Sequence, residues 1–402
     1  MKTSANPQTL EGKMRILFVP GFVADTYSEI ERSFVELCST SDLELEFLWL
    51  VPDISCKLNS FARPESRNTL KEPVCVPYLR KNNIPYVTGN ISRYNLFSNF
   101  LLFREIFRIN GIDAIYTQFG IERFWATFYG KLWGKVTIWN EHWHSLGRRH
   151  TLFKRFFYRL FVDHFIAVSK FIANTLPPYS RVHTIPNAIQ AEPHVKLTPR
   201  EILELRNQFG LTDGTKMVLM VAAFRPEKRH MLALKVCEQI LKNRKDIVFI
   251  FLGNGSVREL FLAKVRDLGL DRHIIAPGHV HNVDDYYSIA SVCILSSHYE
   301  PFGYVVLEAM RHALPVVAFD TGGPAEVIRN GETGFLVKDA DIAEFTQKLL
   351  ELIDSEPLRA AIGERARQAV RQEYNREAWI RQVNTTLKNI VTGHRAQSLK
   401  SA

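Results

Sequence analysis

The sequence predicts an α/β protein with two doubly wound domains, each built on a parallel sheet. Short apolar runs of strand length recur along the chain, and helix-length stretches of mixed polarity separate most of them. The chain has 402 residues, which leaves room for two domains at roughly 150 residues each. With 46% hydrophobic and 23% charged residues, the composition excludes a disordered or fibrous chain.

The first apolar run, Met14–Val19, is closed by Pro20 and Gly21, which is typical of a buried strand that enters a βα loop. Further strands are predicted at 112–117, 136–139, 164–168, 183–185, 217–222, 247–252, 292–295 and 315–319. Helices are expected between them, for example over 231–243 and 257–268. Alternating strands and helices imply parallel sheets with both faces covered.

The two halves are separated by a segment without hydrophobic periodicity that carries Pro193 and Pro199. We therefore expect an N-terminal domain at 1–190, a linker with the first helix of the second domain at 191–213, and a C-terminal domain at 214–375. A C-terminal helix and tail should follow at 376–402. Two doubly wound domains predict a ligand cleft between them, outside the carboxyl ends of the strands.

The formal charge of +9 is unevenly distributed. Residues 1–200 hold 25 Lys and Arg against 17 Asp and Glu, a net charge of +8. This excess predicts attraction to an anionic partner such as phospholipid headgroups, a pyrophosphate carrier or nucleic acid. A basic surface that only interacts with solvent is the equally weighted alternative.

The cysteines and the N-terminus indicate the compartment. Five cysteines occur without any CxxC or zinc-ligand spacing and are expected to be reduced, mostly buried thiols: Cys38, Cys56, Cys75, Cys237 and Cys293. The first residues lack an apolar core, so neither a signal peptide nor an anchor is expected. No apolar stretch reaches the roughly 18 residues that span a bilayer. We expect a cytoplasmic protein, with any membrane contact peripheral, on the inner face.

The segment 296–310 predicts an anion site at the start of a helix. Pro301 suits the first turn of that helix, and Gly303 allows a close backbone approach. Backbone amides near Phe302 and Gly303 would then face an anion such as a phosphate.

Two carboxylates flank this anion site. Glu300 precedes the helix and Glu308 lies within it, roughly 10 Å apart at about 1.5 Å of rise per residue. Carboxylates accept hydrogen bonds from vicinal hydroxyls, so a sugar beside Glu300, a diphosphate at the helix end and a ribose beside Glu308 would satisfy all three elements. That ligand is a nucleotide sugar. The alternative makes Glu300 a loop charge and Glu308 an acid that stabilises the helix dipole.

The residues around these carboxylates resemble the E-x7-E motif of the retaining family 4 glycosyltransferases, which have the GT-B fold. The segments 314–328 and 330–337 are similar to that family's next strand with its Gly-Gly loop and to its Gly-rich hairpin, and the similarity extends over 217–337. The resemblance implies an enzyme that transfers a hexose-type sugar from a nucleoside diphosphate to a hydroxyl acceptor, without a metal and with retention. A lipid-linked or cell-surface glycan precursor is the expected acceptor in polysaccharide biosynthesis, and no cofactor is expected.

The resemblance also implies the donor-binding residues. Lys228 matches a basic residue that neutralises the donor diphosphate. The family's arginine position holds Ala223, so the role of that arginine would pass to Arg225. Gly253 matches a turn that brings backbone close to the nucleotide, and Val280 lies in the loop that contacts the base.

In the first half the resemblance covers shorter segments. His142 matches a strand-end histidine presented to the donor sugar and is expected to act in catalysis with Glu300; a core or solvent histidine is the alternative. Gly21 and Asn187 match positions that contact phosphate or the acceptor, although Ala188 replaces the glycine that usually follows.

The segment 147–161 carries five Arg or Lys and no acid, with aromatic residues at helical spacing. It predicts either a helix packed on the sheet, which is the favoured interpretation, or a helix lying on an anionic membrane surface.

Other functions fit the sequence less well. A sugar-nucleotide epimerase or a phosphorylase could share the fold, but the E-x7-E segment argues against the first, and no pyridoxal phosphate lysine segment supports the second. The triplet Asp339-Ala340-Asp341 is interpreted as a helix cap rather than a metal site. A nucleic-acid-binding protein could use the basic half, yet no recognition motif is present, so no nucleic acid partner is expected.

Overall fold

The computed structural model describes residues 13–21, 29–40, 44–51, 72–73, 75–89, 91–92, 95–120, 122–143, 151–193, 197–212 and 214–401. The chain divides into two compact units. Unit 1 comprises Met1–Ile185 together with Glu377–Ala402, and unit 2 comprises Pro186–Arg376. The last helix of the chain therefore belongs to the unit that contains the N-terminus.

Unit 1 contains a seven-stranded sheet of order β3-β2-β1-β4-β5-β6-β7, in which every pair of neighbours is parallel. Its strands are β1 (Met14–Val19), β2 (Leu45–Val51), β3 (Tyr86–Thr88), β4 (Ala114–Thr117), β5 (Val136–Glu141), β6 (His164–Ala167) and β7 (Val182–Thr184). Strands β2 and β3 were not predicted from the sequence. The apolar β2 is nonetheless an interior strand that pairs with β1 on one side, in register Met14 to Leu45, and with β3 on the other.

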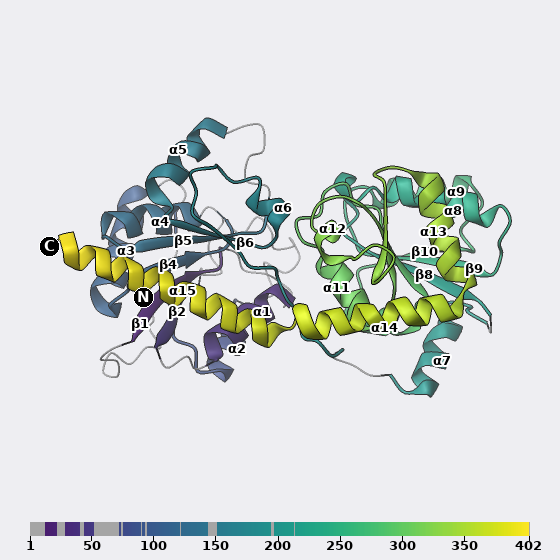
Figure 1. The fold of residues 1–402 in the computed structure, drawn as a ribbon, viewed down its shortest axis with the longest axis horizontal. Helices are drawn as coiled ribbons and strands as arrows, with labels where there is room; N and C mark the ends of the chain where they lie inside the picture. The colour runs from purple at the N-terminus through teal and green to yellow at the C-terminus, as the bar shows by residue number, and fades with distance from the viewer. Residues whose placement is uncertain are drawn as a thin grey trace. The chain divides into compact units, whose positions relative to one another are not determined.

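The helices of unit 1 cover its sheet, as Figure 1 shows. They are α1 (Glu29–Ser39), α2 (Cys75–Lys81), α3 (Leu96–Asn110), α4 (Glu122–Leu132), α5 (Thr151–Phe161), α6 (Lys170–Ala173) and α15 (Arg376–Ser401). Helix α3 packs on α4 and α4 on α5, so these three form one layer. Helix α15 packs on α1, with the rings of Phe34 and Trp379 5.4 Å apart.

Unit 2 contains a six-stranded parallel sheet of order β10-β9-β8-β11-β12-β13. Its strands are β8 (Lys216–Val221), β9 (Ile247–Leu252), β10 (Ile274–Gly278), β11 (Val292–Leu295), β12 (Val316–Phe319) and β13 (Gly334–Val337). The strands expected at 217–222, 247–252, 292–295 and 315–319 are present within one residue at each end.

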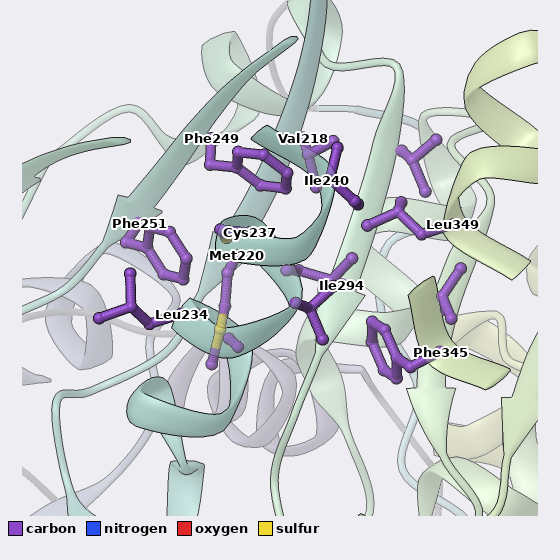
Figure 2. Packing of buried hydrophobic residues seen from close by; sticks show 14 of the residues in the cluster. Val218, Met220, Leu234, Cys237, Ile240, Phe249, Phe251, Ile294, Phe345 and Leu349 are labelled. Atoms are coloured by element: carbon purple, nitrogen blue, oxygen red, sulfur yellow. The ribbon is translucent and has the colours of Figure 1, made fainter. Parts of the chain in front are cut away.

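The helices of unit 2 are α7 (Pro199–Gln208), the short η2 (Pro226–Lys228), α8 (His230–Leu241), α9 (Arg258–Asp267), α10 (Val283–Ile289), α11 (Tyr304–Arg311), α12 (Pro324–Val327), α13 (Ile342–Asp354) and α14 (Glu356–Glu373). The core gathers buried side chains of α8 and α13 over one face of the sheet, as Figure 2 shows. Phe249 and Phe251 of β9 and Ile294 of β11 meet Cys237 of α8 and Phe345 of α13 there.

In both sheets the chain reverses its direction of travel beside the first strand. The reversal lies between the adjacent strands β1 and β4 in unit 1, and between β8 and β11 in unit 2. At such a switch point the loops at the carboxyl ends of the two neighbouring strands separate to opposite faces and leave room for a ligand. The fold therefore indicates that the loops after β1, β4, β8 and β11 are candidate ligand-binding sites.

The cysteines that the structure describes are free thiols, with Cys237 and Cys293 buried and Cys38 and Cys75 half-buried. Cys56 lies outside the described residues. Among the helices of the described ranges, none combines the length and apolar character needed to cross a membrane.

Candidate functional site

An ion pair joins the two loops at the switch point of unit 2. The Lys228 ammonium, just after β8, contacts the Glu300 carboxylate, just after β11. Their side chains are only 17% and 16% exposed, so the pair is largely withdrawn from water. Ser296 Oγ donates a 2.8 Å hydrogen bond to the carbonyl of Lys228, and the amide of His298 donates one of 2.9 Å to the carbonyl of Glu227. The structure therefore brings together two of the predicted site residues.

The backbone from Glu300 to Gly303 is fixed by the Gly-Gly loop that follows β12. The amide of Gly323 donates to the carbonyl of Glu300 at 2.8 Å. A Cβ at Gly323 would lie 2.2 Å from the Cα of Phe302, and one at Gly322 would lie 2.4 Å from the carbonyl oxygen of Glu300. Only glycine permits this approach.

Helix α11 begins at this fixed point. Gly303 is its N-cap, with φ +102°, and no side chain caps the helix. The amide of Val306 donates to the carbonyl of Gly303 at 2.9 Å, and the buried ring of Phe302 lies 5.7 Å from that of Tyr304 at this helix start. The positive end of the helix dipole favours an anion here, and the predicted contact of Phe302 and Gly303 with a phosphate stays a prediction.

Glu308 lies one turn into α11. Its Oε2 atom accepts a 3.1 Å hydrogen bond from the hydroxyl of Tyr287, a residue of α10. Burial and the nearby Glu308 carboxylate raise the pKa of Tyr287 well above its usual range, so this phenol stays protonated and donates. Tyr287 thus orients the Glu308 carboxylate, a contact that the sequence analysis did not anticipate.

The remaining predicted donor residues lie on neighbouring loops of unit 2. Gly253 has φ +136°, and a Cβ there would lie 2.1 Å from the carbonyl oxygen of Ala222. Its amide donates to the carbonyl of Gly278 at 2.9 Å, which ties together the loops after β8, β9 and β10. Val280 is half-buried in the next loop. Arg225 is exposed, and its guanidinium contacts no other predicted site residue among those described.

The switch point of unit 1 places Gly21 against the loop after β4. Gly21 has φ +82°, and a Cβ there would lie 1.7 Å from the carbonyl oxygen of Phe119. The amides of Gln118 and Phe119 donate to the carbonyls of Val19 and Pro20. Close loop packing therefore explains why this position needs glycine, and its predicted contact with phosphate or acceptor stays a prediction.

His142 follows β5 and is 7% exposed. Its Nε2–H donates to Gln118 Oε1 at 2.7 Å, and its ring lies 4.7 Å from that of Phe119. Burial, with a smaller effect of the Arg123 cation, lowers the pKa of His142 to about 3. The imidazole is therefore neutral at pH 7 and available as a hydrogen-bonding group.

A buried charged pair accompanies this histidine. Glu141, at 1% exposure, has Oε2 3.4 Å from Nη1 of Arg123, and the Arg123 guanidinium lies 4.3 Å from the centre of the Trp139 ring. Burial raises the pKa of Glu141, and Arg123 opposes that rise. Neither residue was predicted from the sequence, although the position of Glu141 directly before His142 was an available signal.

Asn187 is buried, at 2% exposure, and belongs to unit 2. Its segment is held there by the amide of Ile189, which donates to the carbonyl of Tyr374 at 3.0 Å. The structure thus assigns Asn187 and Gly21 to different units. The predicted cleft between the domains stays a prediction.

The acidic triplet near β13 has structural partners. Asp341 caps α13 by accepting a hydrogen bond from the amide of Glu344 at 2.9 Å, which confirms its interpretation as a cap. Asp339 pairs with Arg229, with Nη1 2.6 Å from Oδ1. Across the ranges that the structure describes, no group of three or more His, Cys, Asp or Glu side chains is arranged to hold a metal ion.

Curated proteins and solved structures resemble this chain. It is 26% identical over 214 residues to the N-acetyl-alpha-D-glucosaminyl L-malate synthase of Bacillus anthracis, covering 53% of this chain and 55% of that protein. It is also 26% identical over 218 residues to the poly(ribitol-phosphate) alpha-N-acetylglucosaminyltransferase of Staphylococcus aureus, covering 50% and 44%. The chain thus spans about half the length of the curated relatives that it matches.

A solved structure of Anabaena HepE in complex with UDP and glucose superposes with a TM-score of 0.74 at 17% identity, covering 93% of this chain and 99% of that one. This likeness shows the fold, with two Rossmann-like α/β units.

Two family models match successive parts of the sequence. Residues 60–192 match the model described as Glycosyltransferase Family 4, and residues 201–369 match the model described as Glycosyl transferases group 1. Together they cover about three quarters of the 402 residues. The chain belongs to the family 4 glycosyltransferases of the GT-B fold.

Proposed function

We propose that this chain is a retaining, metal-independent glycosyltransferase that moves a hexose-type sugar from a nucleoside diphosphate to a hydroxyl acceptor. The observation that carries the proposal is the Lys228–Glu300 ion pair beside the uncapped start of α11. A cation and the positive end of a helix dipole suit a diphosphate, and the adjacent carboxylate suits sugar hydroxyls. On donor binding the ammonium of Lys228 turns to the diphosphate and frees Glu300 for the sugar.

In this proposal the departing diphosphate serves as the base. The bond between the anomeric carbon and the phosphate oxygen breaks, and the acceptor oxygen bonds to that carbon from the same face. The acceptor's proton passes to the departing phosphate oxygen. Lys228 and the amides of α11 neutralise the charge that develops there, and Glu300 orients the sugar without acting as a nucleophile.

The histidine of unit 1 would bind rather than transfer protons. His142 is neutral at pH 7, because burial lowers its pKa to about 3. A neutral imidazole fixed by Gln118 suits a hydrogen bond to a donor sugar hydroxyl, which is the role that the family resemblance implies.

The acceptor is proposed to be a lipid-linked or cell-surface glycan precursor that meets the basic N-terminal half at the inner face of the membrane. The Staphylococcus aureus relative is named for poly(ribitol-phosphate), an anionic polymer, and HepE was solved with UDP and glucose. These names support a uridine or related nucleotide sugar as donor and an anionic acceptor.

Glu308 is expected to bind the donor ribose, so Glu308→Gln should weaken donor affinity. Loss of a hydrogen bond to a charged group costs roughly 1.5–3 kcal/mol, which is about tenfold to 150-fold in the dissociation constant. Calorimetry with the nucleoside diphosphate measures it, and Glu259→Gln, at an exposed glutamate of α9, is the matched control. An unchanged constant in the folded Glu308 variant would remove this residue from the site.

Arg225 is expected to assist Lys228 in place of the family arginine at Ala223. Arg225→Ala should weaken donor binding roughly tenfold, because a charged hydrogen bond to phosphate is lost. Adding Ala223→Arg to that variant should restore affinity. If Arg225→Ala binds the donor as well as the unaltered chain does, Arg225 has no part in the site.

Lys228 and Arg225 are expected to neutralise the donor diphosphate in place of a metal ion. Initial rates of nucleoside diphosphate release should therefore stay within about twofold after treatment with excess EDTA. Loss of activity that added manganese restores would contradict metal independence.

A further inference from the structure

Helix α5 has two distinct faces. Phe157 and Tyr158 are buried against Trp139 of β5, which confirms that the helix packs on the sheet. Leu152 is nevertheless 84% exposed and Phe156 61% exposed on its outer side. The inner face of α5 thus packs on the sheet, while its outer face exposes apolar side chains to solvent. The packed helix and the membrane-surface helix considered from the sequence are therefore compatible with each other. Arg148 and Arg149, at the start of the basic segment, lie outside the described residues.

A second apolar surface lies on α3, where sequence analysis had predicted nothing. Phe97 is 70% exposed and Leu101 43% exposed on this helix. The two surfaces belong to one layer, because α3 packs on α4 and α4 on α5 (Figure 1). Ring contacts of 5.3 Å between Phe100 and Trp133 and of 5.4 Å between Phe128 and Phe161 continue through this layer.

The exposed residues in the first turns of α3 and α5 lie toward the edge of unit 1 where the strands end, on either side of α4. A helix that follows a parallel strand starts at the carboxyl edge of the sheet, so the first turns of α3 and α5 lie toward that edge. Phe97 lies in the first turn of α3, and Phe153, 64% exposed, in the first turn of α5. Trp143 is half exposed directly after His142 at the same edge.

Basic side chains accompany the apolar ones. Arg104 and Arg108 continue the helical stripe of Phe97 and Leu101 on α3, and both are exposed. On α5, Arg155 and Arg159 are exposed, and the helix contains no acid. Exposed apolar residues with flanking cations are the pattern of a helix that lies in a membrane interface.

We propose that this apolar–basic face binds an anionic phospholipid bilayer. The face consists of the exposed residues Leu96, Phe97, Phe100, Leu101, Arg104 and Arg108 of α3 with Leu152, Phe153, Arg155, Phe156, Arg159 and Leu160 of α5. Apolar side chains insert between headgroups while the guanidinium groups pair with lipid phosphates. Against four exposed arginines, α3 and α5 carry one exposed acid, Glu105, so the net charge favours an anionic lipid surface over a second copy of the chain, whose like charges would repel.

Membrane binding holds the carboxyl edge of unit 1, with His142, at the surface where a lipid-linked acceptor lies. Only this consequence for the acceptor rests on the proposed function. The binding itself follows from the exposure and charge of α3 and α5.

Sedimentation with vesicles tests the proposal. At low salt, the unaltered chain should bind vesicles made of equal parts phosphatidylglycerol and phosphatidylcholine. It should bind vesicles of phosphatidylcholine alone much more weakly. Phe97→Gln combined with Phe153→Gln and Phe156→Gln should reduce partitioning at least tenfold. Arg155→Gln with Arg159→Gln should reduce it roughly fivefold per residue and lessen its salt dependence.

The control replaces equally exposed leucines of unit 2, Leu203→Gln and Leu260→Gln, which are 54% and 62% exposed. These changes should leave vesicle binding intact. The proposal would be overturned if the unaltered chain did not bind anionic vesicles at low salt, or if the triple phenylalanine variant bound them as well as the unaltered chain does. It would also be overturned if the unaltered chain formed a dimer that is lost only in the phenylalanine variant. Hydrolysis of a nucleotide sugar without vesicles, measured on the same variants, should be unchanged and reports separately on the proposed function.

Discussion

All strands within each sheet run parallel, so every strand of a unit ends at the same edge, and every connection returns over one face. Where the order reverses, at β1 and β4 or at β8 and β11, two neighbouring loops leave for opposite faces. Residues far apart in sequence then meet: Lys228 and Glu300 are 72 positions apart, and His142 and Gln118 are 24 apart. The candidate site residues depend on this arrangement of strands more than on any single contact.

Close backbone packing and electrostatics act together at the switch point of unit 2. Gly322 and Gly323 let the β12 loop approach Glu300 and Phe302, which fixes the start of α11. A largely buried ion pair loses hydration on both sides, so it is weak evidence for stability. Its placement beside the start of α11 is what the proposed binding of a diphosphate requires.

The sequence was informative where chemistry is encoded locally. Glu300, Gly303 and Glu308 fall within nine consecutive residues, and the strand ends around them follow from hydrophobic periodicity. The partners Ser296, Tyr287 and Gln118 could not be predicted, because their contacts join different strands and helices. The exposed face of α3 was missed for a related reason: an aromatic-rich helix is typical of a core, and only the packed structure shows which rings stay outside.

The central claim is that the loops after β8 and β11 bind a nucleoside-diphosphate sugar for transfer. Incubation of the purified chain with a panel of such sugars, followed by phosphorus NMR, measures this most directly. The account predicts release of the nucleoside diphosphate from at least one sugar nucleotide, and loss of that release in a folded Lys228→Ala variant. Absence of release and of binding for every member of the panel, or equal release by the variant, would contradict it.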